Sequence, residues 1–205
     1  MDKNSEKRGS TMSLTDRSGL RKYLTPGERK AFLEAASEAD RMVRTFCETL
    51  AYGGCRLREA LELTADRVDM KAGCLVFESL KKRKKGIYRQ VPVPPAFLDT
   101  LDMVHAVRTA QKRPDRGKGA RLWPWSLVSA WRRVKAVMEA AGIQGPHATP
   151  KGLRHAFGVW AVTRNIPLNL VQQALGHAQL STTAIYADAM GEEKQKIFER
   201  MWTDD

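Results

Sequence analysis

The sequence has few cysteines and no long hydrophobic run. Its three cysteines, Cys47, Cys55 and Cys74, form no C-x-x-C pair, which argues against a disulfide framework and a cysteine-based metal site. No apolar stretch approaches the roughly 20 residues of a transmembrane helix. The first 22 residues also carry no apolar core of a secretory signal. We therefore expect a cytoplasmic protein with reduced thiols.

Acidic residues are also in deficit. The 23 Asp and Glu are outnumbered by 35 Lys and Arg, which gives a net charge of +12. One interpretation is that this charge serves solubility alone. The other is a polyanionic partner, because cations that bind nucleic acid release its condensed counterions. Since 42% of the 205 residues are hydrophobic, a folded core is expected in either case.

The hydrophobic pattern divides the chain at residue 22. Residues 1–22 are polar and lack periodicity, which predicts a flexible N-terminal arm ahead of one domain at 23–205. Apolar alternation predicts strands at 68–70, 74–80 and 87–93. Helical periodicity and capping residues predict helices in most of the remainder, from Thr25-Pro26 onward. We expect an α+β fold that is mainly α-helical, with a small three-stranded antiparallel sheet.

Short motifs follow one another along the chain, and each is weak alone. Arg56 comes two residues after the predicted helix stop Gly53-Gly54, and Glu59 lies three residues further on. Later come Lys151-Gly152-Leu153-Arg154, then Leu175-Gly176-His177, and then Tyr186, nine residues past that histidine. In this order and at this spacing they resemble the tyrosine recombinase, or phage-integrase, family. The resemblance covers about residues 24–202 and implies the catalytic-domain fold of that family.

The resemblance implies roles for four of these residues. Arg56 and Arg154 would hold the non-bridging oxygens of a DNA phosphate, which planar, permanently charged guanidinium groups suit. His177 would donate a hydrogen bond to the same phosphate, and Tyr186 would be the nucleophile. Such residues are ordinarily a surface arginine or a packed tyrosine, but the order and spacing of the motifs argue against these alternatives.

Lys151 departs from the commonest pattern of the family, which has histidine at this place. A lysine supplies charge and a hydrogen bond to the phosphate. It acts as a base only where burial and neighbouring cations lower its pKa. The sequence therefore predicts a phosphate-binding role for Lys151 and leaves its role in proton transfer open.

The family also uses a lysine in the turn between the second and third strands to protonate the leaving 5′ oxygen. Five basic residues occupy this turn, from Lys81 to Lys85. Counting forward from Gly73 favours Lys81, whereas counting back from Arg89 favours Lys84. Both remain candidates for the general acid.

By resemblance, the protein is a site-specific DNA recombinase or integrase that cuts and rejoins double-stranded DNA through a 3′-phosphotyrosine intermediate. The family needs no metal, ATP or other cofactor, and its members assemble on DNA as homo-oligomers, with a tetrameric synapse. A helix at 192–202 would dock on a neighbouring protomer or pack on its own domain. The usual N-terminal core-binding domain is not expected in this chain, and the implied context is bacterial, phage-borne or plasmid-borne.

Two other functions remain open at this point. One is a non-catalytic DNA-binding accessory or regulatory protein on the same fold. The other is a type IB topoisomerase-like enzyme that nicks and closes one strand.

Overall fold

The computed structural model describes residues 13–79, 86–112, 119–188 and, near the C-terminus, 195, 198, 199, 201 and 202. Two short 3-10 helices, η1 (Ala65–Arg67) and η2 (Ile185–Asp188), accompany the longer elements. The α-helices described are α1 (Pro26–Ser37), α2 (Arg41–Gly53), α3 (Leu57–Leu61), α4 (Pro95–His105), α5 (Val107–Gln111), α6 (Leu127–Ala140), α7 (Pro150–Thr163), α8 (Leu168–Leu175) and α9 (Ser181–Ala184).

Local capping chemistry sets the ends of the helices that lead to the site. At the start of α1 the Thr25 hydroxyl accepts a hydrogen bond from the Glu28 N–H, and the Glu28 carboxylate accepts one from the Thr25 N–H at 2.8 Å. This reciprocal pair satisfies two backbone donors that the first turn leaves unpaired. Helix α2 ends where Gly54 adopts φ +55°, a conformation that glycine tolerates best. Both predicted boundaries are confirmed.

The strands β1 (Val68–Asp69), β2 (Cys74–Glu78) and β3 (Tyr88–Pro92) form an antiparallel sheet in the order β1-β2-β3. Leu75 pairs with Val68 on one side and with Val91 on the other, and all three side chains are buried. The alternation along β3 exposes Tyr88 and Gln90 but buries Arg89 and Val91. The predicted α+β class with a small three-stranded sheet is confirmed.

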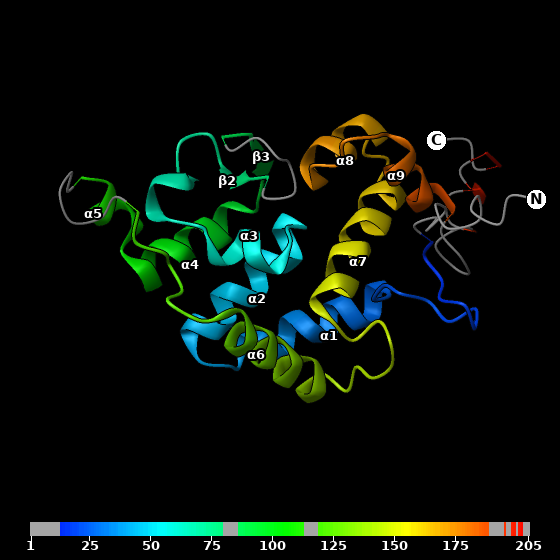
Figure 1. The fold of residues 1–205 in the computed structure, drawn as a ribbon, viewed down its shortest axis with the longest axis horizontal. Helices are drawn as coiled ribbons and strands as arrows, with labels where there is room; N and C mark the ends of the chain where they lie inside the picture. The colour runs from blue at the N-terminus through cyan, green and yellow to red at the C-terminus, as the bar shows by residue number, and fades with distance from the viewer. Residues whose placement is uncertain are drawn as a thin grey trace, which may run out of the picture.

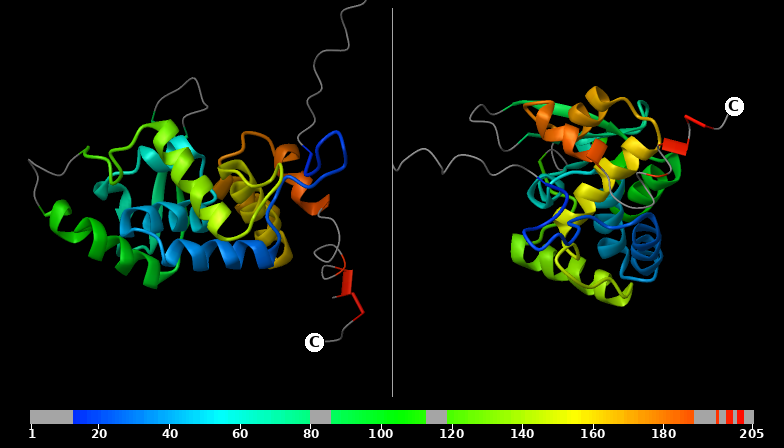
Figure 2. Two further views of the ribbon diagram at one scale, coloured as in Figure 1. Left: turned by 90° about the horizontal axis from the view of Figure 1, so that it is seen from below. Right: turned by 90° about the vertical axis from the view of Figure 1, so that its right-hand side faces the viewer.

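Helices α2 and α7 pack against each other in the middle of the molecule (Figure 1). Helices α1 and α6 lie on one side of this pair, and the sheet and α8 lie on the other, as the right-hand view in Figure 2 also shows. Segments from both halves of the chain therefore meet along α7. Among the described residues, no helix is both long and apolar enough to cross a membrane.

Some sequence predictions concern residues outside those that the structure describes, and at other places the structure adds to what the sequence predicts. Lys81 and Lys84 belong to the undescribed part of the β2–β3 turn, so their predicted roles find no geometry here. The short helix α5 was not predicted; it starts after Ala106, which adopts φ +51°. In the segment assigned to the arm, Leu14 is buried and its carbonyl accepts a hydrogen bond from the Lys22 N–H at 2.7 Å. The division of the chain at residues 22 and 23 stays a prediction.

Candidate active site

Arg56 lies at the N-terminal end of α3, directly after the turn that ends α2. Its Nη1 donates to Oε1 of Glu59 at 2.6 Å, and its backbone N–H donates to Oε2 at 2.9 Å. The Glu59 side chain is fully buried, whereas that of Arg56 is 26% exposed. Burial raises the pKa of Glu59, but the charges and hydrogen bonds of Arg89 and Arg56 outweigh it, so the pKa lies below its usual value. The arginine is thus held by a buried carboxylate with part of its guanidinium facing outward.

Arg89 on β3 is a second partner of this carboxylate. Its Nη2 donates to Oε2 of Glu59 at 2.6 Å, and its Nε donates to the carbonyl of Ala174 in α8 at 2.7 Å. In the sequence, Arg89 served only as the reference position for placing Lys84, and this contact was not predicted. The period-two pattern of β3 offered a signal, because it places Arg89 on the same inward face as Val91.

Arg154 is buried in the first turns of α7 and joins two helix ends. Its Nη1 donates to the carbonyl of Gly54 at 2.8 Å, and its Nη2 donates to the carbonyl of Leu175 at 2.6 Å. These carbonyls stand at the C-terminal ends of α2 and α8, where backbone acceptors lack intrahelical partners. Burial lowers the pKa of Arg154 to about 10, and the nearby charge of Arg56 adds to the effect. The group still carries its positive charge at pH 7.

His177 follows the C-terminal turn of α8 and lies partly buried beside Tyr186. Its Nδ1 is 2.9 Å from Oγ1 of Thr183, and its ring lies nearly parallel to that of Tyr186, 14° apart at a centroid distance of 6.2 Å. Burial lowers the pKa of His177 to about 3, with contributions from the charges of Arg154 and Arg56. The imidazole is therefore neutral at pH 7.

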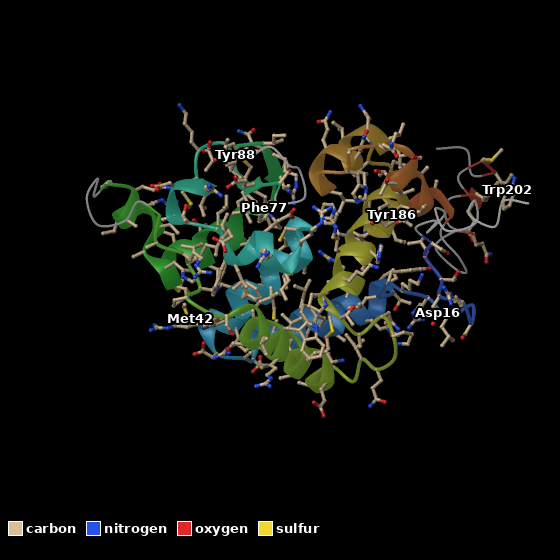
Figure 3. The ribbon with its side chains drawn as sticks, in the orientation of Figure 1. Asp16, Met42, Phe77, Tyr88, Tyr186 and Trp202 are labelled. Carbon is tan, nitrogen blue, oxygen red and sulfur yellow. The ribbon has the colours of Figure 1, made fainter. Side chains whose placement is uncertain are left out.

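Tyr186 lies in η2 and its side chain is fully buried against α7 (Figure 3). Its hydroxyl is 3.2 Å from Nδ1 of His155. The ring lies over Gly158, where a Cβ atom would stand 2.5 Å from the Tyr186 Cζ. Burial raises the pKa of the phenol to about 12, although the charges of Arg154 and Arg56 act in the opposite direction. The candidate nucleophile is thus close to the cations but enclosed.

His155 makes a second contact that the sequence did not reveal. Because it directly follows Arg154, the sequence predicts that His155 lies on another face of the helix in a packing role, and the side chain is indeed buried. It also bonds the hydroxyl of Tyr186, a contact between residues 31 positions apart. Burial lowers the pKa of His155 to about 4, with help from the charges of Lys151 and Arg154, so the ring is neutral at pH 7. The only sequence signal was Gly158 one turn later, which leaves room for a ring.

Lys151 lies in the first turn of α7, three residues before Arg154, and is exposed. Its charge reaches the site, since it contributes to the lowered pKa of His155. The structure therefore brings together Arg56, Arg154, His177 and Tyr186, and leaves Lys151 at the solvent side of the same helix.

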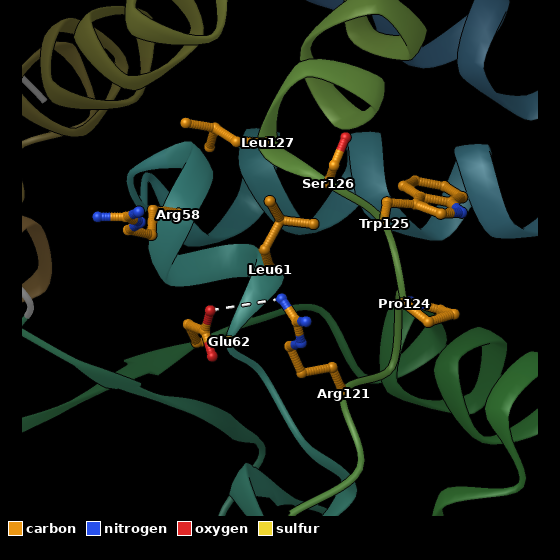
Figure 4. Close-up of a pocket in the computed structure, with 8 residues that line it drawn as sticks. All are labelled: Arg58, Leu61, Glu62, Arg121, Pro124, Trp125, Ser126 and Leu127. Carbon is orange, nitrogen blue, oxygen red and sulfur yellow. Dashed lines mark hydrogen bonds and ion pairs between the residues drawn. The ribbon is translucent and has the colours of Figure 1, made fainter.

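A groove of about 1040 Å³ runs between the sheet and the helices α7 and α8, and Arg89, Gly176 and His177 are part of its wall. A separate pocket of about 330 Å³ lies between α3 and the start of α6 (Figure 4). One ion pair crosses it, between Arg121 and Glu62 at 3.5 Å, and none of the predicted site residues lines it. Within the described ranges, no group of three or more His, Cys, Asp or Glu side chains gathers as metal ligands would.

Comparison with known proteins places this geometry in a family. The sequence pattern of the phage integrase family matches residues 22–193. The chain is 29% identical over 190 residues to tyrosine recombinase XerA of Pyrococcus furiosus, covering 88% of this chain and 62% of the relative. It is 32% identical over 184 residues to tyrosine recombinase XerD of Mycobacterium leprae, covering 82% and 56%. The chain thus spans about three fifths of the length of these relatives.

Solved structures show the same fold. The crystal structure of XerA recombinase superposes with a TM-score of 0.73 at 24% identity, covering 89% of this chain and 66% of that one. The XerH site-specific recombinase bound to its difH substrate gives a TM-score of 0.67 at 21% identity, covering 92% and 60%. The expected fold of the catalytic domain is confirmed. With the match over residues 22–193, the chain belongs to the phage integrase family.

Proposed function

We propose that this chain is a site-specific DNA recombinase in which Tyr186 attacks a DNA phosphodiester, with residues 23–205 as the catalytic domain. The observation that supports this best is the convergence of motifs from distant parts of the chain. The charges of Arg154 and Arg56 both act on the phenol of Tyr186, and the ring of His177 stacks on it. Packing of a tyrosine ring does not require two guanidinium groups near its phenol.

The residues divide the chemistry among them. Arg56, Arg154, His177 and Lys151 hold the non-bridging oxygens, where negative charge grows during attack; each such donor contributes on the order of 10²–10³ in rate. The Oη of Tyr186 forms a bond to phosphorus while the bond to the 5′ oxygen breaks. That oxygen takes a proton from Lys81 or Lys84. The proton of the phenol goes to a base, for which the sequence offers Lys151.

The products of this step are a 3′-phosphotyrosine and a free 5′-hydroxyl. A 5′-hydroxyl from a partner strand reverses the reaction and joins the two strands. Because the covalent link keeps the energy of the phosphodiester, the cycle requires no ATP. The fixed guanidinium groups supply the positive charge that a metal ion supplies in other phosphoryl-transfer sites, so we propose no metal and no cofactor.

The buried state of Tyr186 adds a step before attack. Its side chain is fully enclosed and its hydroxyl bonds to His155, so a phosphate does not reach it in this arrangement. The phenol must leave the pocket over Gly158 before it meets phosphorus. We propose that the structure represents the resting state of the enzyme.

The proposed partner is double-stranded DNA, with further copies of the chain in a tetrameric synapse. Relatives in solved complexes include XerH on difH DNA and a lambda integrase dimer on a COC′ core site. Near the C-terminus, Phe198, Met201 and Trp202 are 44%, 74% and 71% exposed. Exposed apolar side chains of this size favour docking on a neighbouring protomer over packing on their own domain. The proposed location is the cytoplasm of a bacterium, with the gene on a chromosome, phage or plasmid.

Capture of the covalent intermediate tests the proposal without knowledge of the target sequence. Purified chain is mixed with a library of randomised duplexes, each nicked so that a short 5′-hydroxyl fragment diffuses away after cleavage. We expect covalent protein–DNA adducts from the native chain and from Tyr88→Phe, a matched control at an exposed tyrosine. We expect none from Tyr186→Phe, and peptide mass mapping should place the nucleotide on Tyr186.

The other outcomes separate the alternatives. DNA binding without any adduct would identify a non-catalytic DNA-binding protein. Adducts together with relaxation of supercoiled plasmid, but no recombinant product from paired sites, would identify a topoisomerase-like enzyme.

A further inference from the structure

Arg89 lies outside the four motifs, yet it touches two of the segments that carry them. Its side chain is 7% exposed, and it pairs with a carboxylate, Glu59, that is fully buried. The same guanidinium reaches α8, whose C-terminal turn leads to His177. Figure 1 shows β3 and α8 next to each other, and the two elements are in contact. The site therefore contains a third arginine, itself buried, whose role is unassigned.

The first contact of Arg89 limits how Arg56 binds Glu59. An arginine that faces an unshared carboxylate tends to donate to both of its oxygens. Here Oε2 is occupied by Nη2 of Arg89 and by the backbone N–H of Arg56, so the Arg56 guanidinium donates only to Oε1. A guanidinium has five N–H donors. Most of those on Arg56 thus remain available for another anion.

The second contact of Arg89 fixes the turn before His177. Its Nε donates to the carbonyl of Ala174, three residues ahead of the histidine. Gly176 packs directly on the guanidinium, since a Cβ atom there would lie 3.1 Å from Cδ and 3.3 Å from Nη1 of Arg89. One rigid planar group therefore spans the carboxylate behind Arg56 and the backbone beside His177.

A role in stability alone accounts poorly for this arginine. Its Nη1 is buried with no hydrogen-bond partner among the described residues, and an unsatisfied buried donor destabilises the folded state. Buried ion pairs are also often no more stabilising than apolar side chains of similar volume. The Arg89 guanidinium lies over the ring of Phe77 at 5.2 Å, so an apolar residue would pack there without that cost.

We propose that Arg89 is a positioning residue of the phosphate site: it holds Arg56 to a single oxygen of Glu59 and fixes the turn that carries His177. This inference rests on the proposed function for its catalytic consequence. Its structural content, the placement of Arg56, is measurable without DNA.

The test compares Arg89→Met and Arg89→Lys with a matched control, Arg67→Met. Arg67 belongs to an ion pair at the same sheet, with Glu78 at 3.2 Å, but does not contact Glu59. Side-chain ¹⁵N NMR of Arg56 provides the readout that does not depend on DNA. In Arg89→Met we expect the Arg56 guanidinium to bind both oxygens of Glu59, with shifted and more slowly exchanging Nη signals. Arg67→Met should leave these signals unchanged.

Single-turnover adduct formation provides the second readout. At saturating DNA we expect Arg89→Met to lower the rate at least tenfold, with less than a threefold change in the DNA dissociation constant. Arg89→Lys keeps a cation for Oε2 but loses the simultaneous bond to Ala174, so its rate should lie between those of the native chain and Arg89→Met. A purely structural role would move thermal stability and leave the rate at saturation near that of the native chain.

Two glycine substitutions provide a second test in case Arg89→Met does not fold. Gly176→Ala presses on the guanidinium without removing its charge, whereas Gly142→Ala has a similar φ, +69° against +66°, and open space around it. Only Gly176→Ala should change the Arg56 signals. Unchanged Arg56 signals in the folded variants overturn the inference. A native chain that forms no adduct overturns the proposed function instead, and the NMR comparison still decides the role of Arg89.

Discussion

Gly158→Ala places a methyl group inside the pocket that holds the Tyr186 ring. The added Cβ would stand 2.5 Å from Cζ of Tyr186 and 2.6 Å from two further ring carbons, closer than carbon atoms approach without a clash. The ring must shift or leave the pocket. If the enclosed tyrosine is the resting state, this substitution raises the population of the released, attack-competent side chain.

The size of the effect follows from the contacts of Tyr186. Burial of an aromatic ring contributes about 1.5–3 kcal/mol, and the bond to His155 about 0.5–1.5 kcal/mol. The released state therefore lies roughly 2–4.5 kcal/mol above the enclosed one. Overpacking by one methyl costs about 1–3 kcal/mol. Because about 1.4 kcal/mol corresponds to a factor of ten, the released population should rise about 5- to 150-fold.

The assay is covalent adduct formation on a nicked duplex at DNA concentrations below the dissociation constant. In that range the apparent rate constant contains the release step whether it comes before or after DNA binding. We expect Gly158→Ala to react about 5- to 150-fold faster than the native chain, up to the limit set by chemistry. The free energy of unfolding should fall by at most about 2 kcal/mol, since alanine gains about 1 kcal/mol over glycine within a helix and so offsets part of the overpacking cost.

Gly27→Ala is the matched control, because this glycine of α1 has no atom within 4 Å of its added Cβ. It should share the gain in helix propensity and leave the rate unchanged. A Gly158→Ala rate at or below that of the native chain, with DNA affinity and helix content retained, would refute the idea that release of the tyrosine limits the reaction.

Three further predictions concern other parts of the site. Burial lowers the pKa of His155 from 6.5 to about 4 in the folded chain, so between these pH values the unfolded chain binds more protons than the folded one. The free energy of unfolding should therefore fall as the pH drops from 6.5 towards 4, and His155→Gln should flatten this slope in a pH series of thermal melts. Arg154→Lys keeps a charge but not the planar double donation, and it should lower adduct formation at least ~100-fold in single-turnover gels; a loss below tenfold would contradict the assigned role. Changing Phe198, Met201 and Trp202 together to serine should abolish assembly on DNA in sedimentation runs without lowering the melting temperature; unaltered assembly would rule out docking in trans.

Helix ends and motif order were predictable because their causes are local. The capping box at Thr25 and the left-handed Gly54 depend on residues within a few positions of each other. The position of Arg56 after that glycine therefore followed from the sequence. The helical start that carries Arg154 has local causes too, since Thr149 caps α7 and Pro150 occupies its first turn.

The contacts between distant segments were not predictable in the same way. Arg89 meets Glu59 across 30 residues, and His155 meets Tyr186 across 31. Adjacent helical residues point about 100° apart, so His155 was expected to face away from the site of Arg154. Helix α7, however, is packed by α1, α2, α8 and η2. A helix enclosed on several sides presents more than one functional face, and only the packing reveals which.

The anchoring of Arg154 depends on two parts of the chain that are made at different times. Its guanidinium is seated by the carbonyls of Gly54 and Leu175, at the ends of two helices whose sequence positions lie far apart. A growing polypeptide that does not yet include Leu175 lacks one of these two hydrogen-bond acceptors, and it also lacks Tyr186. On the proposed function, a chain that ends before Leu175 would hold Arg154 at one carbonyl only and would have no nucleophile.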